Sequence, residues 1–383
     1  MNGELVTCGY VPLVDCAPLV IAQELGFAAE EGLALALVAQ PSWSALRDML
    51  ALGHLDAAQM LSPMPVAMSL GLGGFKAQID ALMVMSVNGT VLGLSRPLAR
   101  RLRDSGAAPA FGDAAAWRMA LNAAGLPRLR VGVPFYYSMH HLLLRYWLAG
   151  CAQPDLEVEI VAIPPPRMAD AIEKGEIDAF WVGEPWGSAA VARDVAELAL
   201  PGSAVWAFAP EKVLAARHDW ASKSPQTARR LMRAVGQAAR WLDTPSNKPL
   251  AVEILARSEH LNITPEVIDP ALNGQLIPSF GALPVAVERF LVFHKHAANF
   301  PWRSQAAWIA DQLGVSAADR DQAKRVFRPD LYRETFGPVG VDLPGASEKV
   351  EGASQHATAV SSTRGHMILG PDAFFDGRTF DFS

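Results

Sequence analysis

Several side chains that can donate hydrogen bonds stand beside expected strand or helix ends, where a ligand could reach them. They are Trp43, Asn88, Thr90, His140 and Lys212. Trp43 and His140 stand at the starts of two expected helices, and the first backbone N–H groups of a helix attract anions. Lys212 follows an expected strand over residues 205–208, while Asn88 and Thr90 flank a glycine turn. A cleft lined by these donors would suit a small anion.

Each of these residues also has a structural explanation. Trp43 can be a packed edge residue, and His140 can be a surface or satisfied core group. An Asn-Gly pair such as the one at Asn88 is foremost a turn signal. Lys212 can form a solvated ion pair with Glu211 beside it. The placement of these residues at equivalent strand and helix ends is what favours binding, and on that basis Lys212 is expected to be an exposed cleft lysine.

A carboxylate stands at another strand end, in the stretch IEKGEIDAFWVGEPWGSAAV over residues 172–191. A short apolar strand is expected through Ile177 and Phe180, and it runs into Glu184 between two tryptophans. Ligands of open parallel sheets bind outside the carboxyl ends of strands. Glu184 is therefore a candidate ligand residue, although it can instead cap the helix expected from 187.

The same pattern occurs twice in the chain. GHLDA at 53–57 corresponds to GEIDA at 175–179, and TCGYVPL at 7–13 corresponds to RVGVPFY at 130–136. Each copy is expected to form strand, helix, strand, helix, strand, because β-rich runs alternate with segments whose apolar residues recur at three and four. Such alternation makes parallel βαβ units. Two equivalent α/β lobes that face one another are therefore predicted.

The predicted lobes are discontinuous in sequence. Residues 1–95 and 210–383 are assigned to the first lobe, which includes a helical C-terminal part and an extended tail. Residues 96–209 are assigned to the second lobe, and they begin with a helical connection over 96–128. A polar, Gly/Ser-rich arm is expected at 341–365, and the Phe-rich segment after it is expected to dock on the body.

The composition narrows the class of protein. The formal net charge is −6, so the chain lacks the excess of basic residues typical of proteins that bind nucleic acid directly. No apolar run reaches the ~20 residues of a spanning helix, so membrane insertion is not expected. The three cysteines are scattered and show neither disulfide nor metal spacing. The first fifteen residues lack the pattern of an export signal, which predicts a cytoplasmic location; a periplasmic location is the alternative if a signal has been removed.

Sequence motifs of catalysis are missing. The chain has no P-loop, no GxSxG, no HExxH and no GxGxxG after an expected strand. We therefore expect no catalytic residues, no cofactor and no metal, and a binding protein rather than an enzyme.

Several stretches together resemble a known family. They include SWSALRDMLALGHLDAAQMLSPMP at 42–65, LRYWLAG at 144–150, VGEPW at 182–186 and PEKVLA at 210–215. Over roughly residues 5–340 the chain resembles the nitrate- and bicarbonate-binding proteins of bacterial ABC importers. The resemblance implies a two-lobed, periplasmic-binding-protein-like clamshell of type II, with parallel-core sheets flanked by helices.

The resemblance also implies a ligand site. Trp43, His140, Gly183 and Lys212 are expected to surround the anion, by correspondence with the family. Importers of nitrate carry a lysine at the position of Lys212, whereas bicarbonate binders tend to carry an acidic residue, so nitrate or nitrite is expected. Thr90 departs from the family, which usually has Gln there.

Three functions follow from the resemblance. The leading prediction is a cytoplasmic nitrate/nitrite sensor of nitrate assimilation that holds an RNA-binding antiterminator of the ANTAR type. This prediction is favoured by the run PPPRMADAIEKGEIDAF and by the missing export signal. The alternative is the substrate-binding component of a nitrate/bicarbonate-type ABC importer. A third is a thiamine-precursor synthase with lysine-bound pyridoxal phosphate, which lacks its cysteine-rich motif here.

Overall fold

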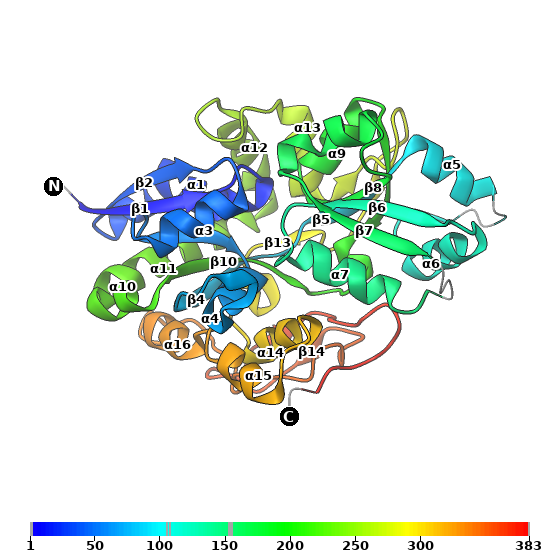
Figure 1. The fold of residues 1–383 in the computed structure, drawn as a ribbon. Helices are drawn as coiled ribbons and strands as arrows, with labels where there is room; N and C mark the ends of the chain where they lie inside the picture. The colour runs from blue at the N-terminus through cyan, green and yellow to red at the C-terminus, as the bar shows by residue number, and fades with distance from the viewer. Residues whose placement is uncertain (1–2, 105, 107–108, 152–155, 382–383) are drawn as a thin grey trace.

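The first lobe contains a six-stranded mixed sheet of order β13-β4-β10-β3-β1-β2 (Figure 1). The computed structural model describes residues 3–104, 106, 109–151 and 156–381. The strands are β1 (Glu4–Tyr10), β2 (Leu33–Ala39), β3 (Ala57–Leu61), β4 (Ile79–Asn88), β10 (Pro210–Arg217) and β13 (Leu291–Val292). Strands β2, β1 and β3 are parallel, and β10 is inserted antiparallel between β3 and β4.

The second lobe contains a five-stranded sheet of order β7-β6-β8-β5-β9. Its strands are β5 (Thr90–Ser95), β6 (Arg128–Val133), β7 (Glu157–Ala162), β8 (Ala179–Gly183) and β9 (Ala196–Pro201). Strands β7, β6 and β8 are parallel, and β5 runs antiparallel to both β8 and β9. The predicted α/β clamshell with parallel-core sheets is confirmed, and each sheet adds antiparallel strands to that core.

The two predicted copies of the sequence pattern have the same topology. In both lobes the first strand of the copy lies between the second and the third, as β2-β1-β3 and as β7-β6-β8. The aspartate of each GxxDA motif makes the same contact. Asp56 accepts a hydrogen bond from the backbone N–H of Thr7, and Asp178 accepts one from that of Arg130, each at 2.9 Å. The repeat therefore specifies the register of its own strands.

The chain passes from the first sheet to the second at Asn88-Gly89-Thr90. Strand β4 ends at Asn88 and β5 begins at Thr90, so the strand over 90–95 already belongs to the second sheet, whereas the predicted boundary lies after residue 95. The chain returns through residues 202–209, which contain the 3-10 helix η4 (Gly202–Ala204). The strand predicted at 205–208 is not formed, and the return strand is β10.

Helices cover both sheets. The first copy of the repeat and its neighbours contain α1 (Ala17–Glu24), α2 (Phe27–Glu30), α3 (Trp43–Ala51) and α4 (Pro63–Leu70). The second lobe contains α5 (Arg96–Asp104), α6 (Ala114–Ala123), α7 (Met139–Leu148), α8 (Met168–Glu173) and α9 (Trp186–Ala192). After the return come α10 (His218–Lys223), α11 (Pro225–Leu242), α12 (Lys248–Ala256), α13 (Pro265–Asn273), α14 (Arg303–Gln312), α15 (Ala317–Lys324) and α16 (Pro329–Phe336). Among the described helices, none is long and apolar enough to cross a membrane.

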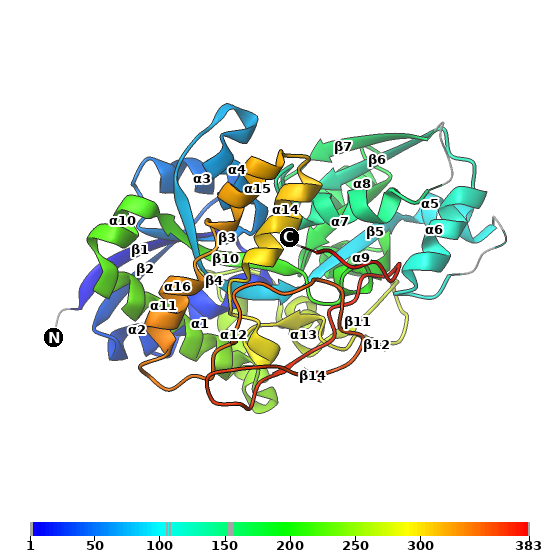
Figure 2. The ribbon, with the colours of Figure 1, turned by 90° about the horizontal axis from the view of Figure 1, so that it is seen from below.

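The C-terminal segment runs beneath both lobes (Figure 2). Up to residue 381 it contains the short strands β14 (Thr358–Ala359) and β15 (Ile368–Leu369). A similar pair, β11 (Gln275–Leu276) and β12 (Val285–Ala286), lies earlier in the chain. Glu351 accepts a hydrogen bond from Ser304 of α14 at 2.6 Å. Phe374 is buried and stacks on Trp206 at 4.9 Å between ring centroids. Docking of the Phe-rich end is thus confirmed.

Candidate functional site

Lys212 lies inside β10 rather than after a strand, and its side chain is completely buried. The pairing of β10 with β4 shifts register on both sides of Lys212, which marks a β-bulge. Neighbouring side chains of a regular strand point to opposite faces. At this bulge, however, Glu211 Oε1 lies 2.7 Å from Lys212 Nζ. The ion pair predicted from sequence is formed, but it is buried rather than solvated, and Lys212 is not exposed.

Asp15 provides a second carboxylate to Lys212, and it was not among the predicted site residues. It lies in the 3-10 helix η1 (Val14–Cys16), directly after β1, with Oδ2 2.7 Å from Lys212 Nζ. Gln59 donates to Asp15 Oδ1 at 2.6 Å and accepts from the backbone N–H of Val11 at 3.1 Å. Asp15 follows the first strand of the first repeat, at the carboxyl end where ligands bind. That position is the signal that could have revealed it.

Two carboxylates therefore surround one ammonium group, so the cleft is not lined by donors alone. Burial raises the pKa of Glu211 to about 7, and the attraction of Lys212 only partly offsets this. Burial also raises the pKa of Asp15, against the opposing effect of Lys212. For Lys212 desolvation lowers the pKa, but Asp15 and Glu211 outweigh it and the pKa lies above the usual value. Lys212 is thus a stable cation, and Glu211 can take up a proton near neutral pH.

Trp43 and His140 bring unpartnered polar atoms to the same place. Trp43 is 1% exposed and His140 is fully buried. Trp43 Nε1 and both ring nitrogens of His140 lack a hydrogen-bond partner in the part of the chain that the structure describes. Lys212 Nζ lies 5.4 Å from the centre of the Trp43 ring, and His140 Nδ1 lies 3.4 Å from Glu211 Oε1. Since buried polar groups are almost always paired, these unpaired atoms around Lys212 make the cluster the candidate ligand site.

Helix caps fix the positions of these two side chains. Ser42 accepts a hydrogen bond from the backbone N–H of Ala45 at the start of α3, and Ser138 accepts one from that of His141 at the start of α7, each at 3.2 Å. Both serines are favoured N-cap residues. Burial and the nearby Lys212 cation hold the pKa of His140 well below its usual value. The imidazole is therefore neutral at physiological pH.

Gly183 lies where the two lobes meet, at the end of β8. A Cβ atom built on it would lie 2.7 Å from Leu13 Cδ2, which is too close for a real side chain. The same point lies 3.6 Å from both Asp15 Oδ2 and His140 Nε2. Glycine at this position lets the first-lobe segment around Asp15 approach the second-lobe helix start at His140. Four predicted residues, Trp43, His140, Gly183 and Lys212, are thus brought together with Asp15 and Glu211.

Asn88 and Thr90 lie at the crossing between the lobes, and their side chains have protein partners. Asn88 donates to the carbonyls of Ala207 and Arg289, each at 3.0 Å, and accepts from the backbone N–H of Ala209 at 3.1 Å. Thr90 accepts a hydrogen bond from the Trp181 indole at 3.0 Å. These contacts fix the two crossing segments against each other; a ligand contact of Asn88 or Thr90 stays a prediction.

Glu184 is buried, and its carboxylate is turned toward the start of α9. Its Oε2 accepts a hydrogen bond from the backbone N–H of Ser188 at 3.0 Å, as the capping alternative expects. Burial raises the pKa of Glu184 to about 7. Its backbone carbonyl accepts from the N–H of Val14 at 2.9 Å and so ties the second lobe to the first. Direct ligand contact by its side chain stays a prediction.

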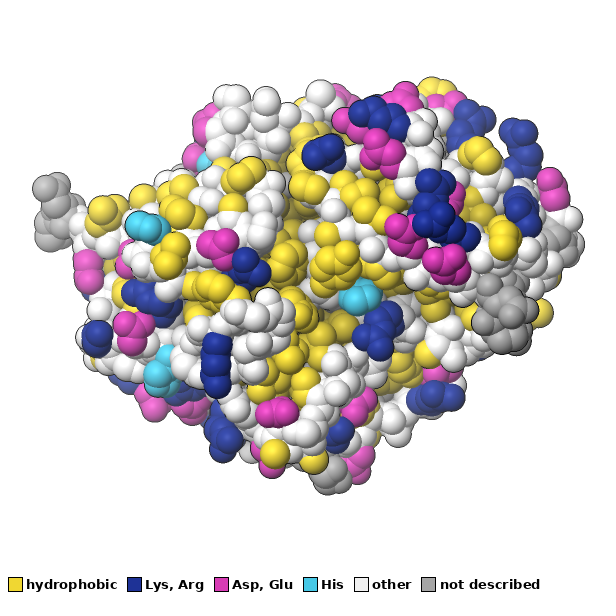
Figure 3. Space-filling view, in the orientation of Figure 1, with side chains coloured by type: hydrophobic (Ala, Val, Ile, Leu, Met, Phe, Trp, Pro, Cys, Tyr) yellow, Lys and Arg dark blue, Asp and Glu magenta, His cyan; other side chains and the backbone are white. Residues whose placement is uncertain are grey.

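Every side chain of the cluster is buried, because the lobes lie against each other over it. Figure 3 shows hydrophobic side chains gathered along the furrow between the two halves of the molecule. Lys212 is therefore shielded from solvent in this arrangement of the lobes. Among the described residues no His, Cys, Asp and Glu group has the arrangement of a metal site.

Comparisons with known proteins agree with this architecture. Residues 2–256 match the model of the NMT1-like family. The chain is 31% identical to the nitrate/nitrite binding protein NrtA of Synechococcus elongatus, over 98% of this chain and 83% of that protein. It also matches the crystal structure of the periplasmic nitrate-binding protein NrtA from Synechocystis PCC 6803, with a TM-score of 0.84 and 27% identity, covering 100% of this chain and 96% of that one.

A further relative is a longer protein, of which this chain matches only a part. The chain is 35% identical to the nitrate import ATP-binding protein NrtC of Synechocystis, over 89% of this chain, but it spans only about half (51%) of that protein. The NrtA relatives are binding proteins, and this chain is likewise a non-enzymatic protein with the solute-binding fold. The family match over residues 2–256 and the coverage of NrtA show that the chain belongs to the NMT1-like family of two-lobed solute-binding proteins.

Proposed function

We propose that the protein binds nitrate or nitrite between its lobes, in contact with Lys212, Trp43 and His140. The observation that carries this proposal is the set of buried polar atoms without partners around a buried ammonium group. The relatives named as nitrate-binding proteins support the choice of anion. Because the contacts come from both lobes, a bound anion prefers the closed arrangement and shifts the population toward it.

The charges require a proton to accompany the anion. With Asp15 and Glu211 both ionised, the cluster around Lys212 already carries a net charge of −1, and a bound anion would add a second negative charge. When Glu211 takes a proton, its O–H can donate to Nδ1 of neutral His140, 3.4 Å away in the closed structure. His140 then carries its own proton on Nε2 and can donate it to the anion. Anion and proton are therefore taken up together.

The best supported setting is that of a substrate-binding component of an ABC importer, since NrtA matches nearly the whole chain. In this role the lobes close on the anion and open when they deliver it. A periplasmic location would go with this role, as it does for the periplasmic NrtA of Synechocystis PCC 6803.

A second candidate is the nitrate/nitrite sensor predicted from sequence. The observation that favours it is the similarity to about half of NrtC, a relative named as an ATP-binding protein. A module of this kind can thus occur joined to an ATPase, where closure on nitrate would control a partner instead of delivering cargo. The RNA-binding antiterminator remains a predicted partner.

Calorimetry of the purified protein with nitrate, nitrite, bicarbonate and sulfate tests the shared part of both candidates. Nitrate or nitrite should bind at one site per chain, and Trp43→Phe should weaken that binding. Absence of binding by either anion would refute the proposal. Cell fractionation then separates the two settings, and co-elution of an RNA-binding antiterminator that nitrate abolishes would favour the sensor.

A further inference from the structure

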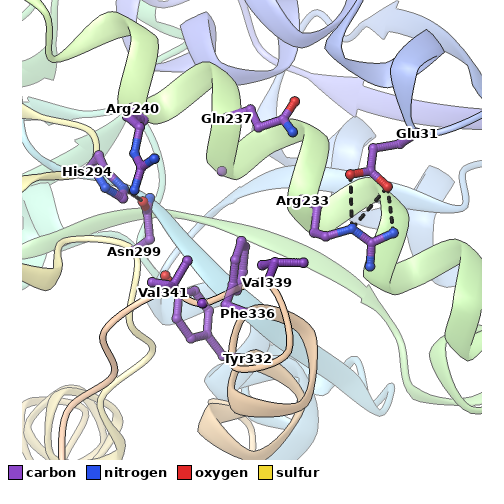
Figure 4. A pocket seen from close by; sticks show the side chains of 12 residues that line it. Glu31, Arg233, Gln237, Arg240, His294, Asn299, Tyr332, Phe336, Val339 and Val341 are labelled. Atoms are coloured by element: carbon purple, nitrogen blue, oxygen red, sulfur yellow. Dashed lines mark hydrogen bonds and ion pairs between the residues drawn. The ribbon is translucent and has the colours of Figure 1, made fainter. Parts of the chain in front are cut away.

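A cavity of about 290 Å³ lies in the first lobe and shares no lining residue with the Lys212 cluster. It is lined by the C-terminal half of α11, the segment 294–299, the helix α16 and residues 339–341 (Figure 4). Small-molecule sites are usually concave and mostly apolar, with a few converging polar groups, and begin near ~300 Å³. The size of this cavity fits a ligand of only a few carbon atoms up to one aromatic ring.

Arg240 gives this cavity a cation that pairs with no carboxylate of the described residues. Three other arginines of α11 are paired with carboxylates: Arg229 with Glu334, Arg230 with Glu4 and Arg233 with Glu31. Within the described part of the chain, no carboxylate forms an ion pair with Arg240. A guanidinium group has five N–H donors in a plane that matches a carboxylate. Figure 4 shows Arg240 beside His294, at the end of the cavity opposite the Arg233–Glu31 pair.

His294 offers an acceptor at the same end. Asn299 donates through its amide nitrogen to the carbonyls of Val84 and Phe293, at 2.9 and 2.6 Å, so its Oδ1 must be an acceptor. His294 Nδ1 lies 2.9 Å from that oxygen and therefore carries the proton. Burial lowers the pKa of His294, which leaves the ring neutral. Its Nε2 is then a lone-pair acceptor without a partner among the described residues.

Tyr332 and its neighbours supply a donor and an apolar wall. The Tyr332 ring packs on Phe336 at 4.4 Å and on Phe300 at 5.5 Å between centroids. Its hydroxyl makes no hydrogen bond to any residue that the structure describes. Burial raises the pKa of Tyr332, so the hydroxyl keeps its proton. Val339 and Val341 complete the wall (Figure 4).

We infer that this cavity binds a small hydroxycarboxylate, with its carboxylate on Arg240, its hydroxyl donating to His294 Nε2 and its carbon skeleton against Tyr332 and Phe336. The carboxylate is selected by the unpaired guanidinium. The hydroxyl is selected by the acceptor at His294. An amino acid fits less well, because the carboxylate of Glu31, which is among the residues that line the cavity, is already held by Arg233 and would not compensate an ammonium group.

The position of the cavity connects it with the crossing between the lobes. Asn299 pairs with Val84 of β4 through its side chain at 2.9 Å and through its backbone carbonyl at 3.0 Å. Strand β4 continues into Asn88, which pairs with β13 just before the segment 294–299. A ligand on His294 therefore contacts the segment 294–299, which is hydrogen-bonded to β4, the strand that leads into the crossing between the lobes. If occupancy changes the lobe equilibrium, nitrate and hydroxycarboxylate affinities must change each other by the same factor.

Calorimetry of the full chain with L-lactate and with mandelate tests the inference, and propionate and phenylacetate serve as matched acids that lack the hydroxyl. At least one hydroxy acid should bind at one site per chain, at least several-fold more tightly than its matched acid. Arg240→Ala should weaken this binding at least about tenfold, as expected for a lost charge-assisted pair. Tyr332→Phe keeps the ring against the carbon skeleton but removes the hydroxyl donor that faces the ligand's oxygens, so it should weaken binding several-fold.

Two control variants distinguish binding in this cavity from binding elsewhere on the protein. Arg229→Ala removes a like residue from the same helix outside the cavity and should leave hydroxy-acid binding unchanged. Lys212→Ala, if it remains folded by circular dichroism, should also retain it, since the two sites share no residue. The inference is overturned if neither hydroxy acid binds, if the matched acids bind equally well, or if Arg240→Ala binds like the unaltered protein.

Discussion

Nitrate affinity should depend on pH through Glu211, and this prediction follows from the ion cluster at Lys212. The pKa of Glu211 is raised to about 7 without ligand. An anion bound beside Lys212 would lie about 5 Å from the Glu211 carboxylate, and two like charges at that distance repel by about 3 kcal/mol at an effective dielectric constant of about 20. That repulsion corresponds to about two further pKa units. Nitrate binding should therefore shift Glu211 strongly toward its protonated form.

The sign of the effect follows from linkage. Below the pKa of about 7 Glu211 is already protonated, and the Kd of nitrate should be constant. Above it, binding must take up a proton, so Kd should rise about sixfold between pH 7.5 and 8.5. Nitrate keeps its charge throughout, so the change belongs to the protein. At pH 8 close to one proton should be taken up per nitrate bound.

Calorimetry at pH 8 in two buffers of different ionisation enthalpy measures this proton uptake directly. Glu211→Gln should bind nitrate with a Kd that varies little over the same range and with no proton uptake. Glu184→Gln is the matched control, because Glu184 is equally buried and also has its pKa raised to about 7, but its carboxylate contacts Ser188 instead of Lys212. A pH-independent Kd in the unaltered protein, or proton uptake retained in Glu211→Gln, would refute the reasoning.

Three further predictions concern the same molecule. Trp43→Phe keeps an aromatic ring but removes the unpartnered indole N–H, so nitrate affinity measured by calorimetry should fall about tenfold. The free energy of unfolding measured in urea should change little. Lys212→Met leaves Asp15 and Glu211 buried without their cation and should cost about 3–5 kcal/mol in urea unfolding at pH 8. The cost should be smaller at pH 5.5, where Glu211 is protonated, and an equal cost at both pH values would contradict this. Phe374→Ala removes a ring packed on Trp206 and Trp308 and should lower the free energy of unfolding by about 3–5 kcal/mol; an unchanged value would show that the C-terminal arm is not part of the folded core.

The duplicated lobes could be predicted because each copy carries the local signals of its own strands. The aspartates of the two GxxDA motifs, for example, accept hydrogen bonds from backbone N–H groups at equivalent positions of the two copies. The helix starts at Trp43 and His140 could be matched for the same reason, since both follow a capping serine. Patterns repeated within a sequence thus predict which parts are equivalent in space.

The charge balance of the site could not be predicted in the same way. Lys212 was expected after a strand because a β-bulge leaves no mark in hydrophobic periodicity, so the strand β10 and the burial of Lys212 were missed. Asp15 lies far from Lys212 in sequence, and only the pairing of β1, β3 and β10 brings the two together. Long-range contacts of this kind depend on strand order, which a local pattern does not contain.

The C-terminal arm adds a third connection between the lobes besides the two crossings of the chain, and its attachment to the second lobe is non-covalent. It is anchored on α14 through Ser304 and Glu351, and on the second lobe through Tyr146, whose hydroxyl donates to Asp376 at 3.0 Å. Opening of the cleft must therefore stretch this arm, slide it along one lobe or break one of its contacts. The arm should in this way limit how far the lobes can open. A chain shortened before Phe374 would open more widely, and a fluorescent label attached beyond Asp376 would report on that motion.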